Sequence, residues 1–416
     1  MSILSDFGLH IERAHQHLKG VIKHTPLQLN HNLSALYDAQ IYLKREDLQV
    51  VRSYKLRGAY NMISQLTNDE QQRGVVCASA GNHAQGFAYS CERLGIRGMV
   101  FMPQVTPRQK IQQTQRFGKD LVSIRLIGDT YDDCAEAAKA YAEKHRMTFI
   151  PPFDDLRIIE GQGTVGIELL NDLPDIDYIF IPIGGGGLCS GVGAYFREHS
   201  PRTTIIGVEP QGAPAMKAAF EAGQPVTLEH IDRFVDGAAV KCAGNLTCQI
   251  CRRVVDDICL VHEGKVCSTI LKLYNEDAIV AEPAGALSIA ALDKYAGVIR
   301  GKNVICIVSG SNNDIDRMQE IKERSLLYER LKHYFLIRFA QRPGALKDFV
   351  NKVMGPNDDI VRFEYMKKTN KDDGPALVGI ELNSAQDYEM LVQRLKENNF
   401  DFTSLAENDN LFTYIV

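Results

Sequence analysis

Two patterns of hydrophobic and polar positions alternate along the chain up to about residue 320. Short, uninterrupted apolar runs are separated by longer segments in which apolar residues recur at helical spacing. Uninterrupted runs are typical of strands in parallel sheets, because helices cover both faces of such sheets. We expect strands at 41–44, 74–78, 97–102, 121–126, 178–182, 204–208 and 303–308, and helices that include 129–145 and 161–170. The alternation predicts an α/β fold with parallel sheets.

The pattern changes after about residue 314. Residues 318–331 are charged and helical in periodicity, and we place a connecting helix at 321–332. Beyond it we expect a strand at 333–339, a helix to Val353, strands at 360–365 and 375–381, a helix at 387–398 and a last strand near Leu411. This β-α-β-β-α-β order predicts a ferredoxin-like α+β domain. The chain is therefore expected to divide into a core, 1–320, and a C-terminal domain, 333–416.

The overall composition is that of a globular protein that binds neither nucleic acid nor membrane. Of the 416 residues, 45% are hydrophobic and 24% are charged, and the formal net charge is −5. No long basic run appears. The N-terminus lacks the basic-then-apolar pattern of a signal peptide, and no apolar run approaches the ~18 residues that span a bilayer. We expect a cytoplasmic protein.

The ten cysteines fit a reducing compartment, because several lie in apolar runs where a free thiol behaves as a small hydrophobic group. Cys248 and Cys251 have the spacing of a redox or metal pair, but no second ligand pair accompanies them. We interpret them as two thiols of one helix and expect no metal site.

Four successive glycines, Gly184, Gly185, Gly186 and Gly187, lie between an apolar run and a helix that is expected to begin near Leu188. Glycines let backbone N–H groups crowd around an anion, and a helix N-terminus adds partial positive charge. The alternative is a tight turn between strand and helix. Four glycines are more than a turn needs, since each costs about 1 kcal/mol of ordering entropy relative to alanine. We expect a phosphate site that is neither a nucleoside-triphosphate nor a dinucleotide loop.

A second small-residue loop, Ser79-Ala80-Gly81-Asn82, follows the strand that ends near Cys77 and leads into a helix. Its backbone donors could receive a carboxylate, and Asn82 could bond a cofactor hydroxyl. The alternative is a helix cap made by Ser79 or Asn82. We expect the neighbouring His83 to be packed rather than catalytic.

Lys55 and Ser309 add two further groups to the glycine run. Lys55 follows a strand-like run and precedes an amphipathic segment, and Ser309 follows the apolar run 304–308. Ser309 could also cap a turn, and Glu282, which precedes Pro283, could begin a helix. An amine that forms a Schiff base, a glycine cradle for a phosphate and a hydroxyl at a strand end are the parts needed to hold pyridoxal phosphate.

Together these segments resemble those of threonine dehydratases, which belong to the fold-type II (tryptophan-synthase-β-like) family of pyridoxal-phosphate enzymes. The resemblance extends over residues 5–320. The motifs that carry it are at 53–59, 79–83, 184–188, 282–285 and 309–312. The segment from about 330 resembles the single ACT-like regulatory domain of the shorter biosynthetic members. The family's core has two subdomains, which implies that a smaller one at about 54–150 is inserted in the larger.

The resemblance implies a role for each group. Lys55 would bind pyridoxal phosphate as a Schiff base and then act as the catalytic base. The other cofactor contacts would come from Gly184, Gly185, Gly186, Gly187 and Leu188 at the phosphate, Asn82 at the ring hydroxyl and Ser309 at the pyridine nitrogen. The substrate carboxylate would lie at Ser79, Ala80, Gly81 and Asn82. The implied reaction converts L-threonine to 2-oxobutanoate and ammonia, the first step of isoleucine biosynthesis.

Three residues bear on reaction type within that resemblance. A neutral hydroxyl at Ser309 would leave the cofactor a weaker electron sink than a carboxylate would, which favours prompt loss of the β-group. Ala80 replaces the serine that delivers a proton in related serine racemases, which argues against racemisation. Ala215 stands where metal-binding relatives have a carboxylate, which argues against a divalent-metal requirement.

The resemblance also implies partners: isoleucine as an effector at the C-terminal domain, and further copies of the chain in a tetramer. L-serine is a possible second substrate. Two other readings stay open, a broader serine/threonine dehydratase or β-replacement enzyme, and a catalytically silent amino-acid sensor.

Overall fold

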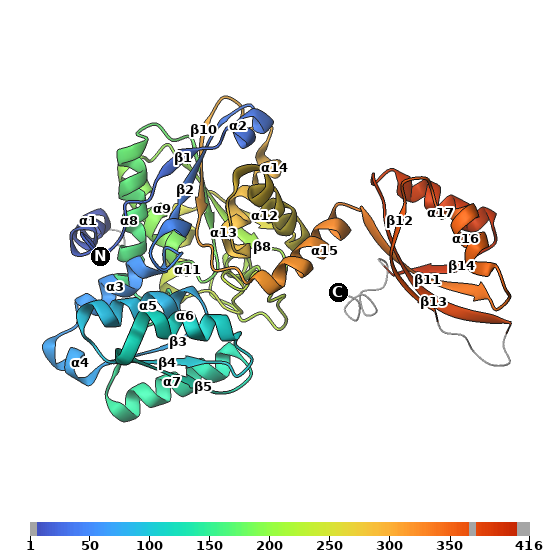
Figure 1. Ribbon diagram of the computed structural model, residues 1–416. Coiled ribbons are helices and arrows are strands. Elements are labelled where there is room, and N and C mark those ends of the chain that lie inside the picture. Colours follow the sequence, from blue (N-terminus) through green and yellow to red (C-terminus); the bar gives the residue numbers. More distant parts are fainter. Residues whose placement is uncertain (1–5, 366–371, 406–416) are drawn as a thin grey trace. The chain divides into compact units, whose positions relative to one another are not determined.

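The computed structural model describes residues 6–365 and 372–405. The chain forms two compact units, Met1–Asp314 and Ile315–Val416. Each unit is described by itself below (Figure 1).

The larger sheet of the first unit has six strands in the order β1-β2-β10-β7-β8-β9. Only β1 runs antiparallel to its neighbour. The strands are β1 (Leu27–Leu29), β2 (Gln40–Arg45), β7 (Tyr178–Pro182), β8 (Thr204–Pro210), β9 (Asp257–Val261) and β10 (Asn303–Val308). Helix α13 (Pro283–Ala290) packs on this sheet beside α12 (Glu263–Asp277). A second helix layer contains α1 (Phe7–His17), α8 (Leu156–Asp172), α9 (Gly187–His199) and α11 (Asn245–Val254).

A smaller parallel sheet, in the order β5-β4-β3-β6, lies between helices on both faces (Figure 1). Its strands are β3 (Val75–Ala78), β4 (Gly98–Met102), β5 (Val122–Leu126) and β6 (Thr148–Phe149). Alternate residues of β3 point to opposite faces: Val75 and Cys77 pack with α3 (Lys55–Ser64) and α5 (Asn82–Leu94), whereas Val76 and Ala78 pack with α7 (Tyr131–His145). This double burial explains the uninterrupted apolar runs.

The predicted α/β architecture with parallel sheets is confirmed, and each predicted strand of the core is present within two residues of its expected bounds. Three strands were not predicted: β1, β6 and β9. The first two have only three and two residues, too few for a periodicity to emerge. The remaining short helices of this unit are α2 (His31–Tyr37), α4 (Asn68–Arg73), α6 (Arg108–Gly118), α10 (Ala215–Ala222) and α14 (Leu292–Tyr295).

The second unit contains an antiparallel sheet in the order β12-β13-β11-β14, which is the ferredoxin-like arrangement. Its elements are α15 (Met318–Tyr328), β11 (Lys332–Ala340), α16 (Ala345–Val353), β12 (Asp359–Tyr365), β13 (Asp373–Glu381), α17 (Asp387–Glu397) and β14 (Asp401–Ser404). Phe349 and Leu391 bring α16 and α17 onto one face of the sheet. The predicted α+β domain is confirmed. The strand expected near Leu411 lies outside the described residues, and β14 occupies the edge beside β11.

A buried ion network joins three segments of the first unit. Arg57 of α3 donates to Glu46, in the short helix after β2, from Nε (2.8 Å) and Nη2 (2.7 Å). Its Nη1 donates to Glu168 of α8 at 2.7 Å, and Lys44 Nζ of β2 donates to the same carboxylate at 2.6 Å. All four side chains are at most 1% exposed. Burial alone would raise the pKa of Glu168, but Arg57 and Lys44 outweigh it and hold that pKa below its ordinary value.

Among the helices that the structure describes, none is both long and apolar enough to cross a membrane.

Replacing Arg57 with methionine would leave two buried carboxylates with Lys44 as their only cation. We expect Arg57→Met to lower the free energy of unfolding by about 3–5 kcal/mol, the usual cost of breaking a buried ion pair from one side. Urea unfolding followed by circular dichroism measures this change. Arg73→Met is the matched control, because the Arg73–Asp69 pair is exposed and should contribute less than about 1 kcal/mol. Equal losses in the two variants would contradict the stabilising role of the network.

Candidate active site

Lys55 is the first residue of α3 and its side chain is only partly accessible to solvent. Its Nζ donates to the backbone oxygen of Pro152 at 2.9 Å and lies 5.4 Å from the centre of the Tyr54 ring. Desolvation lowers the pKa of Lys55 to about 8, although the Glu282 carboxylate opposes this fall. A lysine with this pKa has an appreciable neutral fraction near neutral pH, which an ordinary surface lysine lacks.

The segment Pro152-Phe153-Asp154 connects Lys55 with the glycine run. The Phe153 ring packs so closely on Gly185 that any side chain at that position would overlap it, and a Cβ on Gly187 would lie 3.1 Å from the Phe153 Cβ. Asp154 accepts three backbone N–H groups at the start of α11, from Asn245, Leu246 and Thr247. Asp154 therefore fixes the segment 152–154, in which the Pro152 carbonyl accepts the hydrogen bond from Lys55.

The glycine run connects β7 with α9 and opens at the N-terminus of that helix. Gly186 is the N-cap residue with φ +93°, a left-handed conformation that favours glycine, and no side chain caps the helix. The Gly185 carbonyl accepts Thr247 Oγ1 at 2.6 Å, which fixes the loop. The first N–H groups of a helix have no acceptor within it and attract an anion. Leu188 is 1% exposed in the core, so only its backbone N–H can face a ligand.

The loop 79–82 opens at the N-terminus of α5. Gly81 is its N-cap residue and makes no side-chain cap, so the alternative in which Ser79 or Asn82 caps the helix is wrong. Ser79 Oγ instead accepts the Gly81 N–H at 3.2 Å, and the Asn82 amide bonds elsewhere. Ala80 packs against the core of the small sheet.

Asn82 bonds two residues from the opposite side of the site. Its Nδ2 donates to Glu282 Oε1 at 2.6 Å, and its Oδ1 accepts from Asn312 Nδ2 at 2.6 Å. The backbone N–H of Asn312 donates to Glu282 Oε2 at 3.1 Å. Burial raises the pKa of Glu282 to about 7, and the nearby Asp236 carboxylate adds to this effect.

Ser309 follows β10 and lies beside the start of α3. Its Oγ donates to the Ala284 carbonyl at 3.2 Å, and its carbonyl accepts the Tyr54 N–H at 3.2 Å. The neighbouring Ser53 pairs with Gly310 in an isolated β-bridge, and the Ser53 hydroxyl is buried with no hydrogen-bond partner among the described residues. An unpartnered buried hydroxyl beside Lys55 is consistent with a polar ligand in this site.

His83 is buried, and its Nε2 lies 3.0 Å from the Ile150 carbonyl. Desolvation, with Lys55 nearby, lowers the pKa of His83 to about 3, so the ring is neutral at physiological pH. The prediction that His83 is packed is confirmed. Cys248 and Cys251 are likewise buried thiols of α11, as predicted.

The structure thus connects Lys55, Asn82 and Ser309 through contacts of Tyr54, Glu282 and Asn312. A second connection, through Pro152 and Phe153, joins Lys55 to the glycine run. An amine, a side-chain-free loop at a helix N-terminus and a neutral hydroxyl fit pyridoxal phosphate. Within the described residues, no cluster of three or more His, Cys, Asp or Glu side chains is placed to hold a metal ion.

The sequence alone predicted no role in the active site for four of these residues. Glu282 and Asn312 were recognised as parts of similar segments, and Pro152 and Phe153 were not singled out. Two prolines and a phenylalanine before a helix are a weak signal, because their contribution depends on contacts with Lys55 and Gly185 far along the chain.

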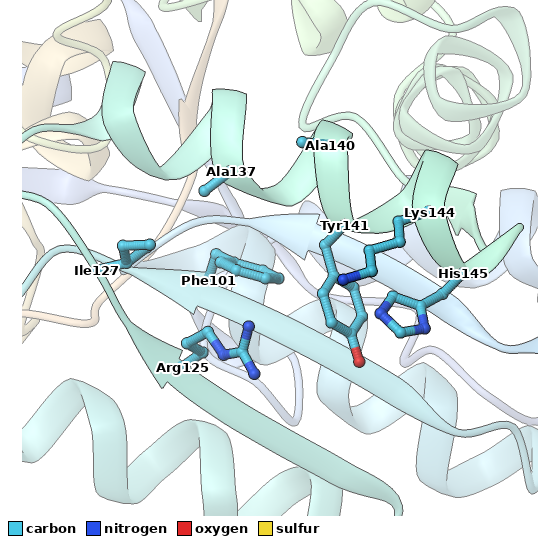
Figure 2. Close-up of a pocket in the computed structure, with 8 residues that line it drawn as sticks. All are labelled: Phe101, Arg125, Ile127, Ala137, Ala140, Tyr141, Lys144 and His145. Atoms are coloured by element: carbon cyan, nitrogen blue, oxygen red, sulfur yellow. The ribbon is translucent and has the colours of Figure 1, made fainter.

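A hollow of about 440 Å³ lies elsewhere in this unit, between α7 and the strands β4 and β5 (Figure 2). Arg125 lies over the rings of Phe101 and Tyr141, and Lys144 and His145 project from α7 beside them. No residue predicted for the active site lines this hollow.

Two family models match the chain. Residues 18–310 match the model of the pyridoxal-phosphate-dependent enzyme family, and residues 323–415 match the C-terminal regulatory domain of threonine dehydratase.

Two curated relatives are biosynthetic L-threonine dehydratases. The protein of Halalkalibacterium halodurans is 57% identical over 404 residues, with 97% of each chain covered. That of Bacillus subtilis is 56% identical over 408 residues, covering 98% of this chain and 97% of the relative.

Two solved structures share the fold. The processed form of threonine deaminase isoform 2 from Solanum lycopersicum has 39% identity and a TM-score of 0.73, covering 77% of this chain and 93% of that one. Maize serine racemase has 28% identity and a TM-score of 0.71, covering 77% and 97%.

A side chain at Gly185 would collide with Phe153 and displace the glycine run. We expect Gly185→Ala to weaken the binding of pyridoxal phosphate at least about tenfold, since displaced N–H donors lose a charge-assisted hydrogen bond. A spectroscopic titration of the cofactor-free chain with pyridoxal phosphate measures this. Gly297→Ala is the control, because a Cβ at Gly297 meets nothing within 4 Å. Unaltered affinity in Gly185→Ala would show that the glycine run does not hold the phosphate.

Proposed function

The chain belongs to the pyridoxal-phosphate-dependent enzyme family and carries the regulatory domain of threonine dehydratase, and from this we propose how each part works. Its activity is that of a biosynthetic L-threonine dehydratase, which converts L-threonine to 2-oxobutanoate and ammonia. The observation that supports the residue assignments best is the partly desolvated Lys55 amine, held by the segment that packs on the glycine run.

We propose that pyridoxal phosphate is held by Lys55, by the backbone N–H groups from Gly184 to Leu188, by Asn82 and by Ser309. When bound, the cofactor supplies the electron sink that accepts negative charge from the substrate α-carbon. The Ser309 hydroxyl is neutral and donates to Ala284, so it brings no charge to the ring nitrogen. With a sink of limited strength, prompt loss of the β-hydroxyl is favoured.

Lys55 is the base in this scheme. Its Nζ, once free, takes the proton from the α-carbon of L-threonine, and a pKa of about 8 suits an amine that must be both free and basic near neutral pH. The Pro152 carbonyl offers this amine a hydrogen-bond acceptor. Burial lowers the pKa of His83 to about 3, so its neutral ring is too weak a base to compete with Lys55.

The loop from Ser79 to Asn82 orients the substrate. Its backbone donors at the uncapped start of α5 are suited to the threonine carboxylate, and the helix dipole favours the negative charge there. Ala80 contributes only a methyl group and cannot deliver a proton to the opposite face of the α-carbon. This supports elimination rather than racemisation, although a serine racemase shares the fold.

The C-terminal unit contains a hollow of about 370 Å³ suited to a small amino acid. It lies between the start of α16 and the rings of Phe339, Phe363 and Tyr365. Gly344, at φ +86°, is the N-cap residue of α16 and makes no side-chain cap, so the helix start can receive a carboxylate. We propose that this unit binds isoleucine, with its apolar side chain beside Leu346 and Phe363.

Oligomerisation is a further proposal. Among the large apolar side chains that are at least half exposed are Leu36, Tyr274 and Val280. Leu36 lies on α2 and Tyr274 on α12, and Asn32, in α2, bonds Asp277 at the end of α12. Exposed apolar groups on adjoining helices support a homo-oligomer, and we propose a tetramer.

We also propose a cytoplasmic location. All ten cysteines lie in the described part of the chain, and each is a free thiol. Free thiols persist in a reducing compartment.

Lys55→Ala is expected to lower the rate of 2-oxobutanoate formation from L-threonine at least about a thousandfold, because both cofactor attachment and proton abstraction depend on this amine. The 2-oxo acid is measured with wild type and variant at the same pyridoxal phosphate concentration. Lys19→Ala, at an exposed position of the same unit, should behave as wild type. Activity retained in Lys55→Ala would refute the assignment of the base.

Leu346→Glu tests the effector site. An acidic residue in the first turn suits the helix, but it would repel the carboxylate of isoleucine, so we expect at least about tenfold weaker isoleucine binding by calorimetry. Activity without isoleucine should be unchanged. Val350→Glu is the matched control, since Val350 is equally exposed on α16 but does not line the hollow. Similar weakening in both variants, or in neither, would contradict this site.

A further inference from the structure

Glu282 precedes a helix, where a carboxylate would be expected to cap the helix, but its side chain does not do so. It is the N-cap residue of α13, followed by Pro283, yet its side chain makes no cap bond with the helix. The side chain is instead 4% exposed and turns toward Asn82 and Asn312. Gly310 lies so close to Oε1 that any side chain there would collide with it. The surrounding backbone is therefore shaped around this carboxylate.

Asn82, Glu282 and Asn312 form a closed ring of hydrogen bonds. Asn82 Nδ2 donates to Glu282 Oε1, Asn312 N donates to Glu282 Oε2, and Asn312 Nδ2 donates to Asn82 Oδ1. Asn312 Nδ2 also donates to the Val51 carbonyl at 3.0 Å. An amide side chain has two hydrogens and two lone pairs, so the ring leaves Asn82 one of each for a ligand and fixes where they point.

The charge of Glu282 also acts on Lys55. The ionisable groups around the carboxylate are Tyr54, which precedes α3, Lys55 of α3, Asp236 of the loop before α11, Lys110 of α6 and, beyond Lys55, His83. Lys110 pairs with Asp236, and His83 is neutral. Lys55 is therefore the cation in this group that the charge of Glu282 would stabilise.

We propose that Glu282 is a positioning residue with two separable effects: its geometry orients Asn82 toward the cofactor, and its charge stabilises the ammonium form of Lys55. This inference rests on the proposed function. Glu282 touches neither reacting atom and acts through Asn82 and Lys55.

The two effects have opposite consequences in Glu282→Gln. Asn82 and the Asn312 N–H donate to different oxygens of Glu282, and a glutamine amide replaces one of these oxygens with an NH2 donor. One of the two hydrogen bonds is therefore lost, and with it the fixed orientation of Asn82. The neutral side chain also removes the charge that favours the Lys55 ammonium, so the pKa of Lys55 falls further and more of the amine is neutral at a given pH. The variant should turn over threonine more slowly yet capture the cofactor at lower pH.

The experiment measures two quantities on the full chain. The first is kcat/KM for L-threonine with saturating pyridoxal phosphate. The second is the pH midpoint for the rate at which the cofactor-free chain captures added pyridoxal phosphate, read from the growth of its visible absorbance. For Glu282→Gln we expect kcat/KM to fall about tenfold, equivalent to one charge-assisted hydrogen bond, and the capture midpoint to move to lower pH by about half a unit or more.

Two further variants separate the effects. Glu282→Asp keeps the charge but cannot reach Asn82, so kcat/KM should fall while the capture midpoint stays near that of wild type. It also carries the test if circular dichroism shows that Glu282→Gln does not fold. Glu263→Gln is the matched control: Glu263 is also buried at a helix start, where it accepts the Gly212 N–H, and neither quantity should change.

The inference is overturned if a folded Glu282→Gln keeps the wild-type capture midpoint, or if both Glu282 variants keep wild-type kcat/KM. A loss of activity without the acid shift would reduce Glu282 to a packing role. A wild-type chain that neither captures pyridoxal phosphate nor forms 2-oxobutanoate would instead refute the proposed function, whatever the variants do.

Discussion

The buried ion network around Arg57 is the constraint on which the position of Lys55 depends. Arg57 lies two residues after Lys55 in α3, and it is held by carboxylates from the segment after β2 and from α8. Two cations and two carboxylates that are removed from water are costly to leave unpaired, so the three segments are held in their places. Close packing adds to this, because Gly161 of α8 lies against the backbone of Arg57, where a Cβ would collide. Lys55 therefore begins a helix that cannot rotate or slide.

The candidate site extends from the start of α3 along the carboxyl ends of parallel strands. The loops after β3, β7 and β10 carry Asn82, the glycine run and Ser309, which is the edge where ligands bind in α/β proteins. Hydrogen bonds between these loops, rather than contacts within any one of them, define the geometry. Burial removes water from the Lys55 amine and the Glu282 carboxylate together, and this shifts both pKa values toward neutrality. Such convergence of perturbed groups is typical of catalytic sites.

Much of this arrangement could be predicted from the sequence, but the contacts between distant residues could not. Features written in local order could be predicted: the apolar strands, a helix start near Leu188 and the separate α+β unit at the C-terminal end. Features created by distant contacts could not. Glu282 has the local pattern of a helix N-cap, and only the folded chain brings it to Asn82, 200 residues earlier. Phe153 gives no sign of its contact with Gly185, and β6, two residues long, has no periodicity to detect. The hydrogen bonds that orient the site residues are the part that sequence reasoning missed.

We infer that the Lys55 amine and the glycine run together bind pyridoxal phosphate, and that Lys55 acts on L-threonine. The most direct measurement is the absorbance spectrum of the purified chain before and after addition of L-threonine, with 2-oxobutanoate assayed in the same cuvette. We expect a cofactor band near the visible edge that changes on addition of threonine while 2-oxobutanoate accumulates. A chain that shows no such band even after addition of pyridoxal phosphate, or a band that threonine alters without any 2-oxobutanoate, would contradict it.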